Sequence, residues 1–208
     1  MAATCRFADR ADAGRRLAAI LPAAPGNTIV LGLARGGVPV AAEVAHALGV
    51  ALDVLVVRKV GHPQQPEYAL GAVSEDGIVL PAGLPAALAE PELRRARSQA
   101  VALRGGRERV PLGGREAIVV DDGLATGRSM RAALQTVAGL GAARVAMAVP
   151  VASAPGLREL EADWEVYALE SVESPEFVAV GQFYNDFEQV DDVAVARLLS
   201  AAGPPRSS

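Results

Sequence analysis

The sequence predicts an α/β fold in which a parallel sheet is flanked by helices. Short apolar runs of strand length alternate along the chain with segments in which apolar residues recur at helical spacing. Strands that alternate with helices are typical of a parallel sheet with right-handed crossovers. The chain has 208 residues, of which 51% are hydrophobic and 4% aromatic, enough for one such domain with a substantial core. We therefore interpret residues 1–208 as a single domain.

The first elements predicted are a helix within residues 8–24, ended by prolines and a glycine, and a strand over residues 28–33. This strand runs into Ala34-Arg35-Gly36-Gly37, and a helix follows that stops at Gly49. The planar guanidinium of Arg35 could pair with phosphate oxygens. The alternative is an ordinary strand-to-helix turn with a surface arginine.

The next strand, residues 52–57, ends in Arg58-Lys59. Residues 60–68 contain two prolines, a glycine and several polar residues, so we predict an exposed and mobile loop. We interpret His62 as a solvated loop histidine rather than a general acid or base. Its position in a polar loop carries no further information.

A turn over residues 74–77 is predicted between two short strands, and a helix is predicted from Pro91. Arginines recur from Arg94 to Arg109 on the face opposite the apolar residues of this helix. We interpret this basic run as a solvated face. The alternative is a dimer contact or a docking surface for an anionic partner.

The most informative stretch runs from Ala117 to Met130. A short apolar strand precedes Asp121 and Asp122, and a loop of glycines and hydroxyls, residues 123–129, leads into a helical pattern. Free N–H groups at a helix start favour a phosphate. The two carboxylates can accept hydrogen bonds from vicinal sugar hydroxyls or hold hydrated Mg²⁺. The stretch predicts a sugar-phosphate ligand, and the alternative is a turn with two solvated carboxylates.

The remaining elements predicted are a strand over residues 144–151, a short helix from 153, a strand over 164–169 and a last helix over 191–201. Aromatic residues gather between the last two, where they either stack on a ligand or pack against one another. Ligands of open parallel sheets bind beyond the carboxyl ends of the strands. The three candidate segments all follow strands, so we expect them to meet at one edge.

The segment Val119-Val120-Asp121-Asp122-Gly123-Leu124-Ala125-Thr126-Gly127-Arg128-Ser129 resembles the phosphoribosyl-pyrophosphate (PRPP) motif of type I phosphoribosyltransferases. The likeness extends over most of residues 28–170 and is closest to adenine-type enzymes, which carry an Arg-Lys pair like Arg58-Lys59 at the corresponding strand end. The resemblance implies a Rossmann-like sheet flanked by helices, with a core over about residues 26–170. It also implies a small hood built from the termini, about residues 1–12 and 171–203.

The resemblance also implies a role for each segment. Asp121 and Asp122 would hold the ribose and, directly or through water, Mg²⁺, and with Arg58 and Lys59 they would form the catalytic set. The 5′-phosphate would be bound by Gly123, Leu124, Ala125, Thr126, Gly127, Arg128 and Ser129. The pyrophosphate would be bound by Ala34, Arg35, Gly36 and Gly37, where backbone amides meet it. Residues 60–68 would form a lid that keeps water from a ribosyl cation.

The implied activity is transfer of the 5-phosphoribosyl group between PRPP and a nitrogenous base, with Mg²⁺ as cofactor. Enzymes acting on 6-oxopurines usually have an aspartate at the position of Ala125, so hypoxanthine or guanine is disfavoured and the base stays unassigned. The alternative is a non-catalytic regulatory protein that senses PRPP or a nucleotide on the same fold.

The composition limits the kinds of partner and the cellular compartment that we expect for this protein. The net charge of −4 does not suggest nucleic-acid binding, and no apolar run approaches membrane-spanning length. The N-terminus lacks an apolar segment of signal length, so we expect a cytoplasmic protein. The lone cysteine, Cys5, has no partner for an internal disulfide. We expect PRPP and a nucleobase-like molecule as partners, and a homodimer.

Overall fold

The computed structural model describes residues 6–62, 64–77, 79–80 and 83–202. At its centre lies a five-stranded sheet in which every neighbouring pair is parallel, which confirms the predicted fold class. The strand order is β2-β1-β6-β7-β8. The bounds in this spatial order are Ala51–Leu55, Ile29–Leu33, Glu116–Val120, Arg144–Ser153 and Glu165–Val172.

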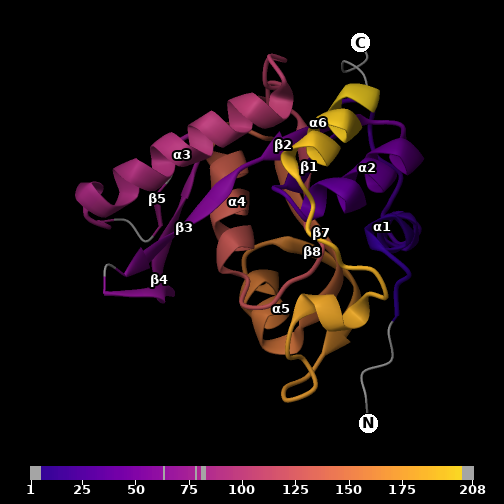
Figure 1. The fold of residues 1–208 in the computed structure, drawn as a ribbon. Helices are drawn as coiled ribbons and strands as arrows, with labels where there is room; N and C mark the ends of the chain where they lie inside the picture. The colour runs from indigo at the N-terminus through magenta and orange to yellow at the C-terminus, as the bar shows by residue number, and fades with distance from the viewer. Residues whose placement is uncertain (1–5, 63, 78, 81–82, 203–208) are drawn as a thin grey trace.

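Helices cover both faces of this sheet (Figure 1). One face packs against α1, α2, α6 and the carboxyl half of α3, and the other packs against α4 and α5. Successive residues of a strand point to opposite faces, so Val30 contributes to the first cluster and Ile29 and Leu31 to the second. The bounds of the helices are Arg10–Ala18 for α1, Gly37–Leu48 for α2, Ala86–Arg104 for α3, Arg128–Gly139 for α4, Ala154–Glu161 for α5 and Asp192–Ala201 for α6.

A second, antiparallel sheet projects from the first and, with α3, forms a unit that we call the arm (Figure 1). Its strands are β3, Val57–His62; β4, Gln65–Ser74; and β5, Val79–Leu80. The predicted loop over residues 60–68 is therefore wrong for residues 60–62 and 65–68, which lie in the two strands of a hairpin. Residue 63 lies outside the described residues. The hairpin forms because Val60 and Val73 are buried together against Ala89 of α3.

The helix α3 begins at Ala86, earlier than the predicted start at Pro91. Proline within a helix removes one backbone hydrogen bond, and Pro91 lies near the amino end, where little of the helix is affected. The interpretation of the basic run as a solvated face is wrong for Arg104. Its side chain is buried, with Nε 3.0 Å from Asp53 Oδ1 and Nη1 2.6 Å from Glu75 Oε2.

Residues 6–12 and 173–191 meet in a small aromatic unit beyond the carboxyl ends of β7 and β8, which we call the hood. Phe7 forms a parallel bridge with Tyr184, and both are buried with Phe183 against Val151 and Val172. A single-turn 3-10 helix, Val180–Phe183, lies within it. All four phenylalanines of the chain lie in this unit, where Phe7 and Phe183 pack the interior. Among the described residues, no helix is long and apolar enough to cross a membrane.

Candidate functional site

The strands β1 and β6 are neighbours, so the loops that follow them lie side by side at the carboxyl edge of the sheet. The contact between the loops is tight. A Cβ added to Gly36 would overlap the Asp122 carboxylate, and one added to Gly37 would lie 2.5 Å from the Val120 carbonyl oxygen. Only glycine allows this approach. Two of the three segments predicted to meet at this edge, residues 34–37 and 121–129, are thus brought together.

Asp121 and Asp122 lie half-buried where β6 ends. The Asp122 amide donates to Asp121 Oδ1 at 2.9 Å, which fixes one carboxylate beside the other. Burial raises the pKa of Asp121 well above its ordinary value, and the negative charge of Asp122 raises it further. Burial also raises the pKa of Asp122, against the opposing effect of Arg10. The pair therefore favours a ligand that brings positive charge or hydrogen-bond donors.

Arg10 is a residue of the site that the sequence did not reveal. Its Nε donates to Asp122 Oδ2 at 2.8 Å, and its Nη1 donates to the Glu188 carbonyl at 2.8 Å. Its guanidinium carbon lies 3.8 Å from the centre of the Phe187 ring. One signal was available, because Asp9 is a good helix N-cap and an arginine in the first turn opposes the helix dipole. Such a cation usually has a carboxylate partner elsewhere.

The loop after the carboxylates is anchored to β7. The Leu124 amide donates to the Val151 carbonyl at 2.8 Å, and the Ser153 amide donates to the Leu124 carbonyl at 2.7 Å. The Ser153 hydroxyl donates to the Ala125 carbonyl. These bonds hold carbonyl groups of the loop toward β7, away from the first turn of α4.

The first turn of α4 completes the loop. Gly127 caps the helix in the left-handed region, with φ of 71°, which a residue with a side chain adopts only under strain. Ala125, Thr126 and Arg128 are exposed, and Ser129 is half-buried. The first N–H groups of a helix have no partner within it, so the turn can receive an anion.

The loop after β1 places its arginine elsewhere. The Ala34 amide donates to the Leu55 carbonyl at 3.0 Å, and the Ala34–Arg35 peptide is cis. Arg35 Nη1 lies 3.5 Å from Asp192 Oδ1 at the start of α6. The backbone of Gly36 and Gly37 lies against Asp121 and Asp122, whereas the Arg35 guanidinium is ion-paired with α6.

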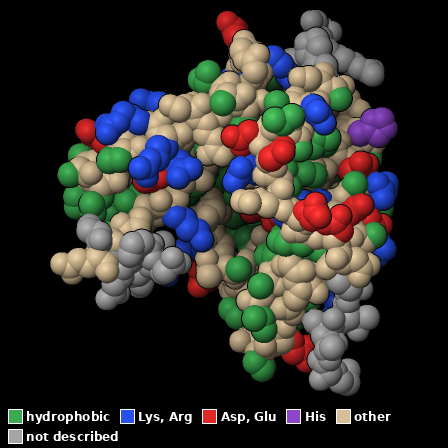
Figure 2. Space-filling model, viewed as in Figure 1, with side chains coloured by type: hydrophobic (Ala, Val, Ile, Leu, Met, Phe, Trp, Pro, Cys, Tyr) green, Lys and Arg blue, Asp and Glu red, His purple; other side chains and the backbone are tan. Residues whose placement is uncertain are grey.

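Arg58 and Lys59 lie inside β3 and do not end a strand of the parallel sheet, so that prediction is wrong. Their side chains point to opposite faces of the strand. Arg58 donates to Glu92 Oε2 at 2.7 Å and to Gln99 Oε1 at 3.3 Å, both on α3, whereas Lys59 is exposed. Lys and Arg side chains gather on the arm, and the surface is hollowed between the arm and the rest of the molecule (Figure 2).

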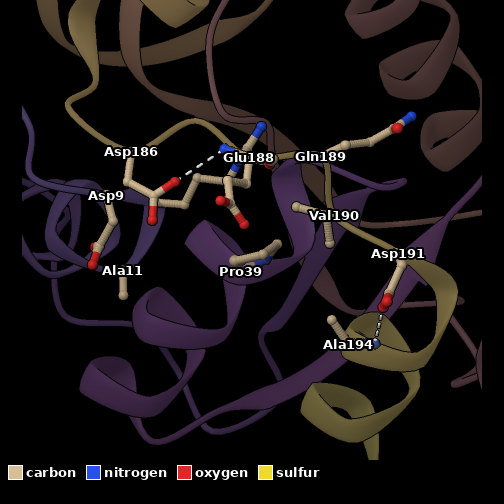
Figure 3. Close-up of a pocket in the computed structure, with 10 residues that line it drawn as sticks. Asp9, Ala11, Pro39, Asp186, Glu188, Gln189, Val190, Asp191 and Ala194 are labelled. Atoms are coloured by element: carbon tan, nitrogen blue, oxygen red, sulfur yellow. Dashed lines mark hydrogen bonds between the residues drawn. The ribbon is translucent and has the colours of Figure 1, made fainter.

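A pocket of about 340 Å³ opens beside Arg10 (Figure 3). It lies between the start of α1, the first turn of α2 and the hood segment that leads into α6. Four of its ten lining residues are acidic, and Arg10 is the lining residue that also contacts Asp122. The lining residues are Asp9, Arg10, Ala11, Pro39, Asp186, Glu188, Gln189, Val190, Asp191 and Ala194.

The carboxylate pair fits one kind of metal binding. Mg²⁺ is usually held by one or two carboxylates together with substrate phosphates and water. Asp121 and Asp122 offer such hard oxygen ligands next to a predicted phosphate loop. In the part of the chain that the structure describes, no group of three or more His, Cys, Asp or Glu side chains could hold a metal. These donors therefore suit an ion that arrives with a phosphorylated ligand.

The fold and this edge define a protein of the phosphoribosyltransferase class. A family model described as the phosphoribosyl transferase domain matches residues 8–187, and the chain belongs to this family. Two curated relatives from strains of Mycobacterium tuberculosis, provisionally named phosphoribosyl transferases, are 44% identical over 211 residues. The matches cover 94% of this chain and 47% of each relative, so the chain spans about half the length of the curated relatives it matches.

Solved structures share the fold of this chain. A protein of Thermus thermophilus is 43% identical and superposes with a TM-score of 0.78 over 96% of this chain and 100% of its own. A hypothetical protein from Neisseria gonorrhoeae, solved with bound ppGpp, is 12% identical and has a TM-score of 0.52. That match covers 95% of this chain and 98% of the other, and it shows a shared fold alone.

Proposed function

We propose that the chain is a phosphoribosyltransferase that transfers the 5-phosphoribosyl group between PRPP and a nitrogenous base. The observation that carries the proposal is the contact of two loops at neighbouring strand ends. One loop offers a buried carboxylate pair and a helix start, and the other offers the glycine backbone of Gly36 and Gly37. A ligand with a phosphate, a ribose and a pyrophosphate needs these groups close together.

Different residues of the site bind different parts of PRPP. The first turn of α4, with Thr126 and Ser129, binds the 5′-phosphate through N–H and hydroxyl donors. Asp121 and Asp122 accept from the ribose hydroxyls and favour the positive charge that develops on the ring as pyrophosphate departs. The backbone of Gly36 and Gly37 lies beside them for the pyrophosphate. Mg²⁺, when bound, neutralises charge on the departing pyrophosphate.

The arm contributes a lid. Lys59 is exposed on β3, and closure of the hairpin would bring its ammonium group toward the pyrophosphate and exclude water from the ribosyl cation. Arg58 has a different part, because its guanidinium is bonded to Glu92 and Gln99 of α3. We assign Arg58 to holding the hairpin on α3 rather than to contact with PRPP.

The acceptor base is unassigned, but one feature of the loop restricts the choice. Ala125 is exposed at the loop and offers no acid to a base. An acceptor that needs a carboxylate at this position, as 6-oxopurines usually do in the resembling enzymes, is disfavoured. Adenine-like and other nitrogen acceptors remain compatible, and we expect the protein to act in nucleotide salvage or synthesis.

The test is a screen of nucleobases with PRPP and Mg²⁺ that reads pyrophosphate release, with Asp121→Asn as the matched inactive variant. The proposal predicts release with at least one base in the wild-type protein and none above background in the variant. No release with any base, in a protein that does not bind PRPP either, would overturn the proposal.

A second candidate is a regulatory protein that binds PRPP or a nucleotide without turnover. The observation that favours it is that two of the predicted cations, Arg35 and Arg58, form pairs within the scaffold, with Asp192 and Glu92. PRPP binding by calorimetry without pyrophosphate release from any base would select this candidate.

The expected state of the protein is a cytoplasmic homodimer without a nucleic-acid partner. The net charge of −4 supports the last point, since non-specific nucleic-acid binding relies on basic surface. Sedimentation analysis of the purified chain would test the dimer. A single species of monomer mass across the concentration range would contradict it.

A further inference from the structure

Arg10 connects the hood to the PRPP motif, although 112 residues separate it from Asp122 in the sequence. The contact is well shielded, with the side chain of Arg10 11% exposed and that of Asp122 14% exposed. The guanidinium is held on two further sides, by the Glu188 carbonyl and by the Phe187 ring. An arginine with three such partners is fixed in place rather than screened at the surface.

Asp122 is in turn held from several directions. Besides the Arg10 contact, its carbonyl accepts from the Tyr184 hydroxyl at 2.6 Å, and its amide donates to Asp121. Its carboxylate also lies against Gly36, where an added Cβ would be 2.8 Å from the Asp122 carboxyl carbon. Contacts from the hood thus hold Asp122 against the loop that follows β1.

Each of the two carboxylates has one oxygen engaged within the protein. Asp122 Oδ2 accepts from Arg10 and Asp121 Oδ1 accepts from the Asp122 amide, whereas the second oxygen of each accepts no hydrogen bond from the described residues. We propose that Arg10 is a positioning residue of the sugar-phosphate site, which fixes Asp122 against Gly36 and so sets the direction in which the two carboxylates face the ligand. This inference rests on the proposed function for its ligand.

The pocket beside Arg10 makes the proposal testable by chemical rescue. Arg10 lines this opening of about 340 Å³, so Arg10→Ala leaves a cavity that a small cation can reach from solvent. Methylguanidinium, below denaturing concentrations, carries the same planar donor group and can restore the bond to Asp122. A purely structural loss of the arginine stem would not respond to this cation.

Arg16→Ala is the matched control. Arg16 lies on the same helix, its guanidinium carbon lies 5.6 Å from the centre of the Phe7 ring, and it donates to the Arg6 carbonyl at 3.0 Å. It pairs with Asp12 and does not contact Asp122. Its removal therefore takes away contacts of the hood without removing the Arg10 contact to Asp122.

The first measurement needs no ligand. Amide hydrogen exchange over residues 35–38 and 122–124 should quicken by about tenfold or more in Arg10→Ala, because local opening follows the loss of contacts. It should return toward wild type with methylguanidinium and stay unchanged in Arg16→Ala. Unchanged exchange in Arg10→Ala, or equal changes in both variants, would overturn the proposal. If Arg10→Ala does not fold, Arg10→Lys, which keeps the charge without the planar donors, replaces it.

The second measurement is calorimetric titration with PRPP and Mg²⁺. We expect about tenfold to a hundredfold weaker binding in Arg10→Ala, since truncating one partner of a buried charge pair leaves the other uncompensated. Methylguanidinium should recover most of this loss and leave wild-type affinity unaltered. Absence of binding in the wild-type protein contradicts the proposed function, and the ligand-free exchange then decides the role of Arg10. Normal binding in Arg10→Ala overturns the positioning role while the proposed function stands.

Discussion

The carboxyl edge of the parallel sheet and the arm are held together by different forces. The loops at the edge sit on strands buried on both faces by large apolar clusters, and glycines bring the loops into direct contact. The arm has a small buried apolar cluster of its own, which contains Val60, Val73 and Ala89. Its helix α3 is joined to the core of the parallel sheet by the apolar residues Ala96, Ala100 and Leu103 and by the buried ion pairs of Arg104. The edge is therefore held by apolar packing, whereas the arm is held by apolar packing together with buried charges.

Arg104 of α3 is a buried polar link between the two regions. It binds Asp53 of β2, the Val54 carbonyl and Glu75 at the base of the hairpin. Asp53 also accepts from the Val110 amide at 3.0 Å. Burial works to lower the pKa of Arg104, but hydrogen bonds and charge from Glu75 and Asp53 outweigh it and raise that pKa. The link is therefore a permanently charged one.

The largest loss of stability is expected from Arg104→Met, which removes the buried cation between the arm and the parallel sheet. The substitution leaves Asp53 and Glu75 buried without their cation, and we expect the free energy of unfolding to fall by about 3–5 kcal/mol. Denaturant unfolding followed by circular dichroism measures the change. Arg94→Met is the control, because the Arg94–Glu90 pair is exposed and should change stability by less than about 0.5 kcal/mol. Equal effects of the two substitutions would show that the buried link does not hold the arm.

The next largest loss of stability is expected from a substitution at the carboxyl edge of the parallel sheet. Gly36→Ala places a Cβ in the Asp122 carboxylate, and we expect a loss of about 1–3 kcal/mol in stability from overpacking. Binding of PRPP should fall by more than about tenfold, since a displacement of roughly 1 Å at a positioning contact is costly. Gly113→Ala is the matched control, because a Cβ there meets nothing within 4 Å. If a folded Gly36→Ala variant bound PRPP with unaltered affinity, the loop that follows β1 would have no part in binding the ligand.

Asp121→Asn is expected to change the free energy of unfolding by a smaller amount, and to raise it where the two preceding substitutions lower it. The raised pKa of Asp121 means that the folded state keeps its proton to higher pH than the unfolded state. Its stabilising contribution is present below the unfolded pKa and is lost as pH rises through the folded pKa. At neutral pH the ligand-free variant should therefore gain about 0.5–2 kcal/mol, as is common when a strained functional group is removed. A pH series of thermal unfolding should show a flatter slope above the unfolded pKa for the variant. A loss of stability together with normal ligand binding would assign Asp121 to the scaffold.

The smallest change in stability is expected on the arm surface. Lys59→Ala should leave the free energy of unfolding within about 0.5 kcal/mol, because the side chain is exposed. Pyrophosphate release should nevertheless fall in this variant, whereas Arg58→Ala should chiefly loosen the hairpin, as seen by hydrogen exchange over the described residues of β3 and β4. Normal turnover in Lys59→Ala would remove the lid role from this lysine.

The sequence was informative where structure is local. The strand, carboxylate pair, loop and helix over residues 117–139 follow from short-range patterns, and so does the parallel sheet. The hairpin was missed because Gly61 interrupts the alternation, with register shifts on either side of it, and because the packing of Val60 on Ala89 spans distant residues. Two prolines in the segment also favoured a loop.

The site residues divide in the same way. Asp121 to Ser129 could be recognised within one segment, whereas Arg10 could not, since its partner lies 112 residues away and its role appears only when the hood closes on the sheet. Arg104 shows the same limit. Its place in a run of exposed arginines predicts a surface residue, and only the distant carboxylates of Asp53 and Glu75 make it a buried one.

The central claim is that the ends of β1 and β6 form one ligand site that exists before the arm moves. Hydrogen exchange of the wild-type protein, with and without PRPP and Mg²⁺, tests it most directly. We predict that PRPP slows exchange in residues 34–38 and 121–129 together, and that it does so equally in Arg58→Ala, where the arm is loosened. Slowed exchange confined to the arm, or to one of the two loops, would contradict the account.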